Sequence, residues 1–397
     1  MVKKYALYLF LGIVLTSCEK EEITNNTVAP IETIIAPDNI ENTSPEINPD
    51  TPINNWIDGQ QSASGLLISS ENFDFVSLYD NSLAALLFTR KGELPKAELI
   101  LDFFANRVEF EFETQTGGFY QFRTANGENG SRKWLGDNAW LLIAINHYHE
   151  ASNTRKYAAM ADKLESWMRS LQDEDGGLYG GYNEDGSMIP KVTEGIMTAY
   201  NAIPGYDDFH KNILRYLKAN RWDPDLQNLN AWPENEAYTN ALDILAISQG
   251  VFEDFPKQSL LVADQLFLTS QIVTLSGQQI TGYCFDEDKD VIWLEGTAQM
   301  AVALQTNGNI DRSKELLGEI EKTFIQGFAT NDSKGIPYVT NHGTNYGAGL
   351  LWDHADLTPA LSSTIWYLFG QMNFNPFLLA KEKNIPENDK FWLLQSK

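Results

Sequence analysis

The stretch Trp134-Leu-Gly-Asp-Asn-Ala-Trp140 runs on into apolar residues as far as Tyr148, which predicts a buried helix with an acidic residue near its start. The same arrangement recurs along the chain: an acidic residue opens a segment of small and apolar residues. The six openings are spaced by 57, 57, 42, 59 and 61 residues, at Asp80, Asp137, Glu194, Glu236, Glu295 and Asp356. A period of this length indicates a repeat architecture.

Each apolar segment is followed by an amphipathic one with its charges on one face. The couplets are 75–87 with 95–107, 137–150 with 154–171, 194–203 with 206–220, 237–249 with 255–273, 295–305 with 311–325, and 359–370 with a short tail helix near 376–381. A helix that is apolar on all sides must be buried, and an amphipathic helix can cover it. Six such couplets predict an all-α (α/α)6 toroid, an inner ring of helices inside an outer ring, with a few short strands in the rim loops. An open helical solenoid is the alternative.

Ring closure has a consequence for function. In an up-down ring the inner helices all run in one direction, so their starts gather at one end of a central funnel. We expect these starts near Asp80, Asp137, Glu194, Glu236, Glu295 and Thr358. The funnel should therefore be lined with carboxylates.

The first residues have a different character. A short basic start, Met1 to Lys4, precedes an apolar run that ends at Leu15, which is the pattern of a signal peptide. Leu15-Thr16-Ser17-Cys18 resembles the lipobox of bacterial lipoproteins; an ordinary secretory signal is the alternative. The resemblance implies that Cys18 carries lipid and anchors the chain in a bacterial envelope membrane, an outer membrane facing the periplasm or the cell surface. The proline-rich residues 19–55 predict an extended tether, and the toroid domain is expected to span 56–397.

The amino-acid composition limits the kinds of partner that the protein could bind. The net charge of −25 argues against nucleic acid and against any membrane contact other than the lipid anchor. Ten Trp, 16 Tyr and 21 Phe offer flat apolar faces that suit sugar rings, although most of them must fill the core. Two cysteines cannot build a cysteine-based zinc site, and no nucleotide fingerprint is present. We therefore expect a carbohydrate partner and neither a cofactor nor a metal ion, with Cys284 in a packing role.

Two motifs carry a family resemblance. Gly136-Asp137-Asn138-Ala139-Trp140 resembles the inner-helix motif of endo-acting mannanases and unsaturated glucuronyl hydrolases, and the turn in 171–178 is similar to those common in (α/α) toroids. The chain thus resembles the six-hairpin glycosidase-like superfamily. The mannanases use adjacent aspartates, and because the second position holds Asn138, only Asp137 carries over. Sugar epimerases with this fold use paired histidines, for which His342 and His354 are placed in rim loops.

The resulting hypothesis is a glycoside hydrolase that works with paired carboxylates. Asp137 would be the general acid or base, with Glu295, Glu194 or Asp353 as its partner and Asp80 as a further carboxylate. The sugar would contact Tyr79, Trp134, Trp140, Tyr182, Trp232, Trp293, Trp352, His342 and His354. In the alternative interpretations the acidic residues only stabilise helix starts and the funnel binds an oligosaccharide without catalysis, or the toroid is a lyase or an epimerase.

Overall fold

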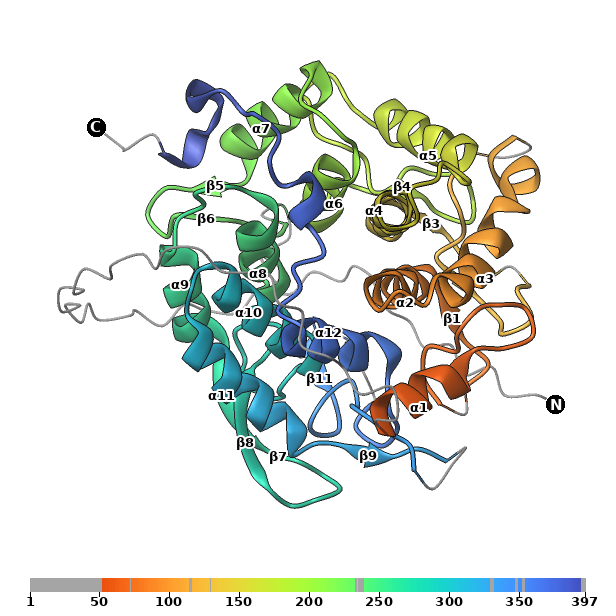
Figure 1. Ribbon diagram of the computed structural model, residues 1–397. Coiled ribbons are helices and arrows are strands. Elements are labelled where there is room, and N and C mark those ends of the chain that lie inside the picture. The colour runs from red at the N-terminus through yellow and green to blue at the C-terminus, as the bar shows by residue number, and fades with distance from the viewer. Residues whose placement is uncertain are drawn as a thin grey trace.

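Twelve α-helices form two concentric rings in the computed structural model, which describes residues 52–393 apart from 72, 114–115, 129, 233, 235–238, 329–331, 347–348 and 352–353 (Figure 1). The inner ring consists of α2 (Leu78–Arg90), α4 (Leu135–Ser152), α6 (Thr193–Ala202), α8 (Leu242–Val251), α10 (Leu294–Thr306) and α12 (Leu361–Gln371). The outer ring consists of α1 (Pro52–Gln60), α3 (Leu94–Ala105), α5 (Ala158–Ser170), α7 (Asp208–Asn220), α9 (Gln258–Phe267) and α11 (Ile310–Glu321). The predicted (α/α)6 toroid is confirmed.

Short antiparallel strand pairs lie in the loops between the helices, as predicted. The pairs are β1 (Val76–Ser77) with β2 (Phe122–Arg123), β3 (Lys133–Trp134) with β4 (Gly181–Tyr182), β5 (Trp222–Asp223) with β6 (Asn228–Leu229), β7 (Leu268–Ile272) with β8 (Gln279–Tyr283), β9 (Ile325–Gln326) with β10 (Lys334–Gly335), and β11 (Thr344–Tyr346) with β12 (Gly349–Leu351). β1–β2 and β3–β4 join the loops of successive hairpins, so they add to the contacts between repeat units.

One hydrogen bond recurs six times and links the units into a ring. The first backbone N–H of each inner helix donates to a carbonyl in the loop of a neighbouring unit, over 2.8–3.3 Å. The six pairs are Leu78 to Gln121, Leu135 to Gly180, Thr193 to Ala231, Leu242 to Phe285, Leu294 to Tyr338 and Leu361 to Ser69. The first N–H groups of a helix have no partner within it, so each needs one elsewhere. The last pair joins the end of the chain to its beginning.

A polar side chain three residues further on strengthens this link in four of the six inner helices. Asn81, Asn138, Thr297 and Thr364 each donate to the carbonyl of the residue before the helix and accept an N–H from the adjoining loop. All four side chains are buried. The inner-helix starts are therefore fixed by hydrogen bonds on two sides.

The sixth outer helix is α1. The predicted short tail helix is present as the 3-10 helix Leu378–Ala380, but its assignment to the outer ring is wrong. α1 buries Ile53, Trp56 and Ile57, and the Trp56 indole donates to Glu71 over 2.9 Å. Pro52 was expected to forbid a regular element, but it occupies the first helical position, where a missing N–H costs nothing. Residues 52–55 thus belong to the toroid and not to the expected tether.

Other boundaries also differ from the prediction: α5 begins at Ala158 and not at residue 154, and α11 ends at Glu321 and not at residue 325. α8 begins at Leu242 and not near Glu236, which lies outside the described residues. α9 ends at Phe267, and the remainder of the predicted helix to residue 273 is the strand β7. α12 begins at Leu361, so Asp356 lies in the preceding loop.

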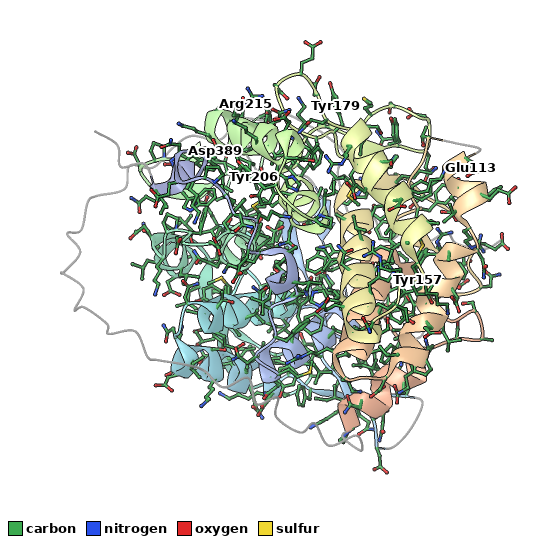
Figure 2. The ribbon with its side chains drawn as sticks, turned by 45° about the horizontal axis from the view of Figure 1, so that its top comes forward. Glu113, Tyr157, Tyr179, Tyr206, Arg215 and Asp389 are labelled. Carbon is green, nitrogen blue, oxygen red and sulfur yellow. The ribbon has the colours of Figure 1, made fainter. Side chains whose placement is uncertain are left out.

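The C-terminal residues 373–393 cross the far end of the ring. They contain only short 3-10 turns, at Leu378–Ala380, Glu387–Asp389 and Phe391–Leu393. Tyr206 donates to Asp389 over 2.8 Å and ties this tail to the loop before α7 (Figure 2). The tail therefore takes part in the fold, although it supplies no outer helix.

No helix within the described part of the chain is both long and apolar enough to span a membrane. Cys18 and the tether as far as residue 51 lie outside the described residues, so their roles stay predictions.

Trp56→Ala tests whether α1 closes the ring. Removing a buried indole should cost about 3–5 kcal/mol of unfolding free energy. The melting temperature should fall clearly, whereas Asp58→Ala, on the exposed face of α1, should change stability by no more than about 1 kcal/mol. Equal melting of the Trp56→Ala variant and the wild type would contradict the assignment of α1 to the ring.

Candidate active site

The inner-helix starts surround a cavity of about 560 Å³. Its wall includes residues from all six inner helices and from the loops before them. The carboxylates that line it are Asp74, Asp80, Asp137, Glu194, Asp243 and Glu295, and the aromatic residues are Phe73, Phe75, Tyr79, Phe122, Trp134, Trp140, Trp232, Phe285, Trp293 and Tyr338. The predicted funnel of carboxylates and aromatic rings is therefore present.

The inner-helix acids do not act as N-caps. Asp80 and Asp137 are the third residues of their helices, and Glu194, Asp243 and Glu295 are the second. The cap positions hold Ser77, Trp134, Val192, Ala241 and Trp293, and only Ser77 caps through its side chain. These acids therefore do not occupy N-cap positions, although all of them lie in the first turn of a helix. The positive ends of six helix dipoles nevertheless face the acids and favour their charged forms.

Asp137 and Glu194 form one pair of unequal carboxyls. Burial and then the negative charge of Glu194 raise the pKa of Asp137 well above its usual range. Burial also raises the pKa of Glu194, but hydrogen bonds from Thr198, Trp140 and Trp134 oppose the rise. Thr198 lies 2.9 Å from the Glu194 carboxylate. Of the two carboxyls, Asp137 therefore holds its proton more strongly, and Glu194 has more donors that stabilise its charged form.

The close contact between α4 and α6 explains why position 136 of the motif is a glycine. A Cβ on Gly136 would lie 2.3 Å from a carboxylate oxygen of Glu194, so only glycine leaves room for that carboxylate beside Asp137. Among the described residues, Asp137 Oδ2 has no hydrogen-bond partner, although the side chain is only 7% exposed. A buried oxygen in that state is available to a ligand in the cavity.

Asp80 and Glu295 form a second unequal pair. Burial raises the pKa of Asp80 to about 8, and the charge of Glu295 adds to the rise. Tyr79 and Gln299 donate to the same oxygen of Glu295 over 2.6 and 3.0 Å, and Trp366 in turn donates to the Tyr79 hydroxyl over 2.7 Å. These donors stabilise the charged form of Glu295 against its burial.

Asp243 is a site residue that the sequence analysis missed. It lines the cavity, and burial, followed by the charge of Glu194, raises its pKa to about 7. A signal was present, because Leu242-Asp243 repeats the Leu294-Glu295 pattern. Asp243 also lies 49 residues after Glu194 and 52 before Glu295, a more even spacing than Glu236 gives.

The predicted sugar-contacting residues divide into three groups. Those that line the cavity are Tyr79, Trp134, Trp140, Trp232, Trp293 and His354. Tyr182 and His342 are not cavity-lining residues: Tyr182 lies in β4 opposite Lys133, and exposed His342 stacks edge-on against His354 at 4.5 Å. Trp352 and Asp353 lie outside the described residues.

Several lining residues had no sequence signal. Gln121, Phe285 and Tyr338 come from loops, and their carbonyls accept the first N–H of an inner helix in another unit. Only the closed ring brings them to the cavity. The pKa of Tyr338 is raised well above its usual range by burial and by Glu295, so its hydroxyl stays a proton donor.

Asn138, in place of the second aspartate of the mannanases, has a structural role. It is fully buried and bonds to both backbone groups of Phe119 and to the Trp134 carbonyl, over 2.8–3.0 Å. It does not line the cavity. Only Asp137 of the Asp-Asn pair faces the site.

Cys284 fits the predicted packing role. Its thiol is buried next to Asp286, 3.5 Å away, and burial raises its pKa to about 12. A thiol that stays protonated is a poor nucleophile and a poor metal ligand. The ligand atoms of Cys284, Asp288 and Asp290 lie within 4.8 Å of one another, but two of these residues are partly exposed acids of the kind that often gather without an ion.

Comparison with solved structures finds the same fold in several carbohydrate-active enzymes. Similar structures include a glycosidase variant in complex with glucose (13% identity, 80% of this chain and 93% of that chain, TM-score 0.56). Others are an α-amylase from Clostridium perfringens (12%, 81% and 96%, 0.57) and a cellobiose 2-epimerase from Spirochaeta thermophila (14%, 83% and 95%, 0.55). No protein-family model and no curated protein matches the chain. The chain thus has the toroid that glycosidases and sugar epimerases share, as the sequence resemblance implied for its fold.

Asn138→Asp should destabilise the protein without adding a catalytic acid. A carboxylate at this position cannot donate to the Phe119 and Trp134 carbonyls, and two buried acceptors would lose their partners. We expect a loss of about 2–3 kcal/mol, measured by thermal or urea unfolding. Asn220→Asp, at an exposed position, should stay within about 0.5 kcal/mol of the wild type. A stable Asn138→Asp variant would contradict the structural role.

The raised pKa of Asp80 and of Asp243 predicts a stability that falls as the pH rises. Between pH 4 and 8 the folded protein holds protons that the unfolded chain has released, so the slope is negative, at most about 1.4 kcal/mol per pH unit for each group. The melting temperature should be higher at pH 5 than at pH 8. Asp80→Asn should make the decline shallower, whereas Asp208→Asn, at an exposed site, should keep it. Identical slopes in wild type and Asp80→Asn would contradict the assignment.

Proposed function

We propose that this protein is a glycoside hydrolase that uses Asp137 as its general acid. The observation that carries the proposal is the Asp137–Glu194 pair, two neighbouring carboxyls of which only Glu194 has three side-chain donors that oppose the rise of its pKa, within a cavity lined by aromatic rings. Two carboxyls whose pKa values are pushed apart are the pattern of acid and base assignments in hydrolases. That similar folds belong to a glycosidase and an α-amylase supports this class.

In this proposal Asp137 donates its proton to the glycosidic oxygen as the bond to the anomeric carbon breaks. Positive charge develops on the sugar ring, and the ionised Glu194 and Glu295 stabilise it. One of these two carboxylates then takes a proton from the attacking water, or attacks the anomeric carbon itself. Tyr79 and Gln299 keep Glu295 charged until that step.

We also propose that the enzyme is a lipoprotein held in a bacterial envelope membrane through Cys18, with the tether carrying the toroid away from the lipid. The lipobox resemblance and the proline-rich segment support this proposal. An export route agrees with a glycan substrate outside the cytoplasm.

A sugar epimerase is the second candidate, and one contact favours it. The rings of His342 and His354 lie 4.5 Å apart at the rim, and His354 lines the cavity. Structures of sugar epimerases are also similar to this fold. Product analysis separates the candidates, because hydrolysis releases new reducing ends and epimerisation interconverts sugars of unchanged length.

Asp137→Asn is the direct test of the hydrolase. The amide cannot donate the required proton, so turnover of a substrate found by a glycan screen should fall by about 10²–10⁴-fold. The amide fills nearly the same space, and the unfolding free energy should change by no more than about 1 kcal/mol. Asp208→Asn, an acid in the first turn of outer helix α7, should keep wild-type turnover.

Two outcomes would contradict the role of Asp137. One is wild-type turnover in Asp137→Asn. The other is loss of turnover together with early melting, which would make the residue structural. If His354→Gln abolishes activity while Asp137→Asn does not, the epimerase becomes the better assignment.

A further inference from the structure

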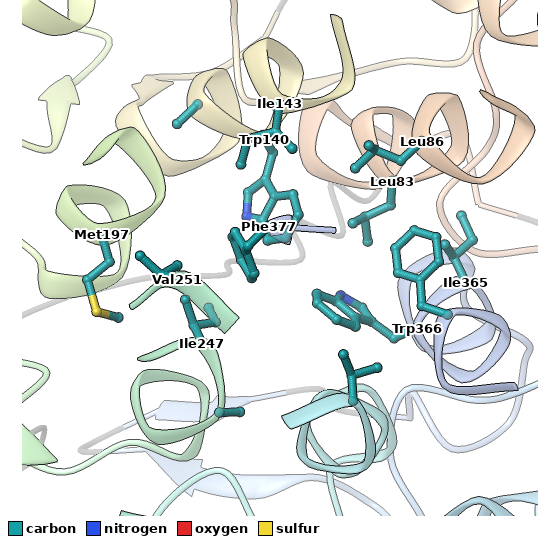
Figure 3. Packing of buried hydrophobic residues seen from close by; sticks show 14 of the residues in the cluster. Leu83, Leu86, Trp140, Ile143, Met197, Ile247, Val251, Ile365, Trp366 and Phe377 are labelled. Atoms are coloured by element: carbon teal, nitrogen blue, oxygen red, sulfur yellow. The ribbon is translucent and has the colours of Figure 1, made fainter. Parts of the chain in front are cut away.

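The cavity ends in an aromatic floor. Trp140 lines the cavity, and the Phe377 ring lies 4.8 Å from it while the Trp366 ring stands edge-on at 5.8 Å (Figure 3). Phe377 and Trp366 do not themselves line the cavity, so they support Trp140 from behind. Leu83, Ile247 and Val251 also lie around the middle of the ring (Figure 3), and Ile247 lines the cavity beside Trp140.

The C-terminal tail holds this floor in place by bonding to the far ends of the inner helices. Asn375 and Lys381 donate to the carbonyls of Gly250 and Gln249 at the end of α8, over 3.1 and 2.9 Å. The backbone carbonyls of Pro376 and Phe377 bond to His147 and Asn201, over 2.8 and 3.1 Å. Carbonyls at a helix C-terminus need partners, and lysine suits the negative end of the dipole.

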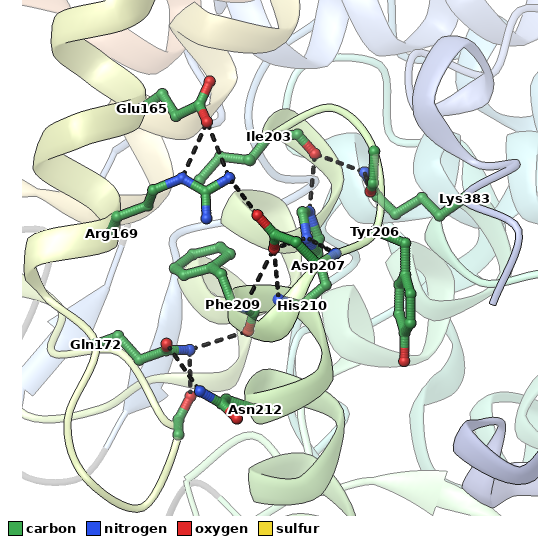
Figure 4. A network of polar contacts seen from close by, with 12 residues as sticks. Glu165, Arg169, Gln172, Ile203, Tyr206, Asp207, Phe209, His210, Asn212 and Lys383 are labelled. Atoms are coloured by element: carbon green, nitrogen blue, oxygen red, sulfur yellow. Dashed lines mark hydrogen bonds and ion pairs between the residues drawn. The ribbon is translucent and has the colours of Figure 1, made fainter. Parts of the chain in front are cut away.

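Lys383 makes the next attachment, after α6. Its ammonium donates to the Ile203 carbonyl over 2.6 Å, and Ile203 also accepts from His210 of the Asp207–Arg169 network (Figure 4). The side chain is only 3% exposed. The tail therefore closes the ring at the end opposite the carboxylates.

The walls complete the enclosure. Every inner helix and loops from all six units contribute described residues to the lining, so the space is a pocket within a ring and not a groove across a surface. Its volume, about 560 Å³, falls in the range of about 300–1,000 Å³ typical of sites that enclose one small ligand. A long chain passing through has no room below Trp140.

The charge of the pocket restricts its ligand further. None of the described residues that line it is a lysine or an arginine. Arg132 acts on Asp137 electrostatically, but it stacks over Trp134 and donates to Gln121, and it does not line the pocket. A uronate or sulfate group would meet several carboxylates without a cation, and burying an uncompensated charge is costly. Hydroxyl groups, in contrast, can form a hydrogen bond with the unpartnered Oδ2 of Asp137.

From this geometry we infer that the site takes the end of an uncharged glycan chain. The last few sugar residues enter through the mouth between the six loops and stop at Trp140, and the rest of the chain stays outside. This inference rests on the proposed function and specifies it as chain-end cleavage of neutral glycans. Phe377 is then a positioning residue, which sets the depth of the pocket through Trp140.

The test uses the full chain and two matched panels of linear hexasaccharides, and the reducing ends of all fragments are labelled after quenching so that every product is detected. One panel is neutral, made of glucans, mannans, xylans and galactans, and the other consists of oligogalacturonates and oligomannuronates. Product lengths are followed with time by capillary electrophoresis. We expect the shortest products from the first time point with stepwise shortening of the remainder, and kcat/KM at least about 100-fold lower on the uronates than on the best neutral substrate.

Phe377→Ala tests the floor, with Leu378→Ala as the matched control because Leu378 is an exposed apolar neighbour in the same tail. The Phe377→Ala variant should show a raised KM and longer first products, and Phe377→Tyr should restore the wild-type pattern. Leu378→Ala should match the wild type. An unchanged product pattern in a folded Phe377→Ala variant would overturn the positioning role. If that variant does not fold, the product lengths of the wild type still test whether cleavage occurs at the chain end.

The experiment distinguishes a failure of this inference from a failure of the proposed function. Products of intermediate length from the first time point would overturn chain-end action while leaving the hydrolase in place. Faster turnover of uronates would overturn the neutral-substrate assignment alone. Absence of both turnover and calorimetric binding across the two panels would overturn the proposed function and this inference with it.

Discussion

The hydrogen bond between the first N–H of each inner helix and a loop carbonyl of another unit is the interaction on which this molecule depends. A buried backbone donor without a partner is costly, so each inner helix can start only where a neighbouring loop supplies an acceptor. The residues that supply these carbonyls include Gln121, Phe285 and Tyr338, whose side chains enter the cavity. The contacts that close the ring are therefore the contacts that assemble the site, and neither can be changed alone.

The ring also explains how several carboxylates tolerate one another. Glutamate at the second helical position can reach a donor one turn further along its own helix, as Glu194 reaches Thr198 and Glu295 reaches Gln299. The aspartates at the third position, Asp80 and Asp137, have no such donor. Side-chain length and helical position together give the two glutamates donors that Asp80 and Asp137 lack, and these donors oppose the rise of the glutamate pKa values. The difference between the acids that the proposed acid–base chemistry needs thus follows from the repeat itself.

The local part of this architecture could be predicted from the sequence. Periodicity predicted the apolar inner helices, their acidic starts and the toroid, because the pattern of buried residues repeats within each segment. Long-range features were not predictable in this way. Tyr338 reaches the cavity through a partner in another unit, and α1 was overlooked because proline at Pro52 was taken as a break. From the sequence, the fourth acid is placed at Glu236 because small and apolar residues follow it, and Asp243, whose spacing is more even, is missed.

One of the six junctions in the ring is not bridged by the chain. At the other five the chain runs from one inner helix through an outer helix to the next, but α12 and α2 meet only through non-covalent contacts. Examples are the hydrogen bond from Leu361 to Ser69 and that between Ser70 and Thr358, two residues 288 positions apart. Closing so long a loop carries an entropic cost that its contacts must offset, and contacts of this separation slow folding. The carboxylate pocket exists only once both ends of the domain have met. In a chain exported as we propose, the pocket could therefore form only after α12 had crossed the membrane.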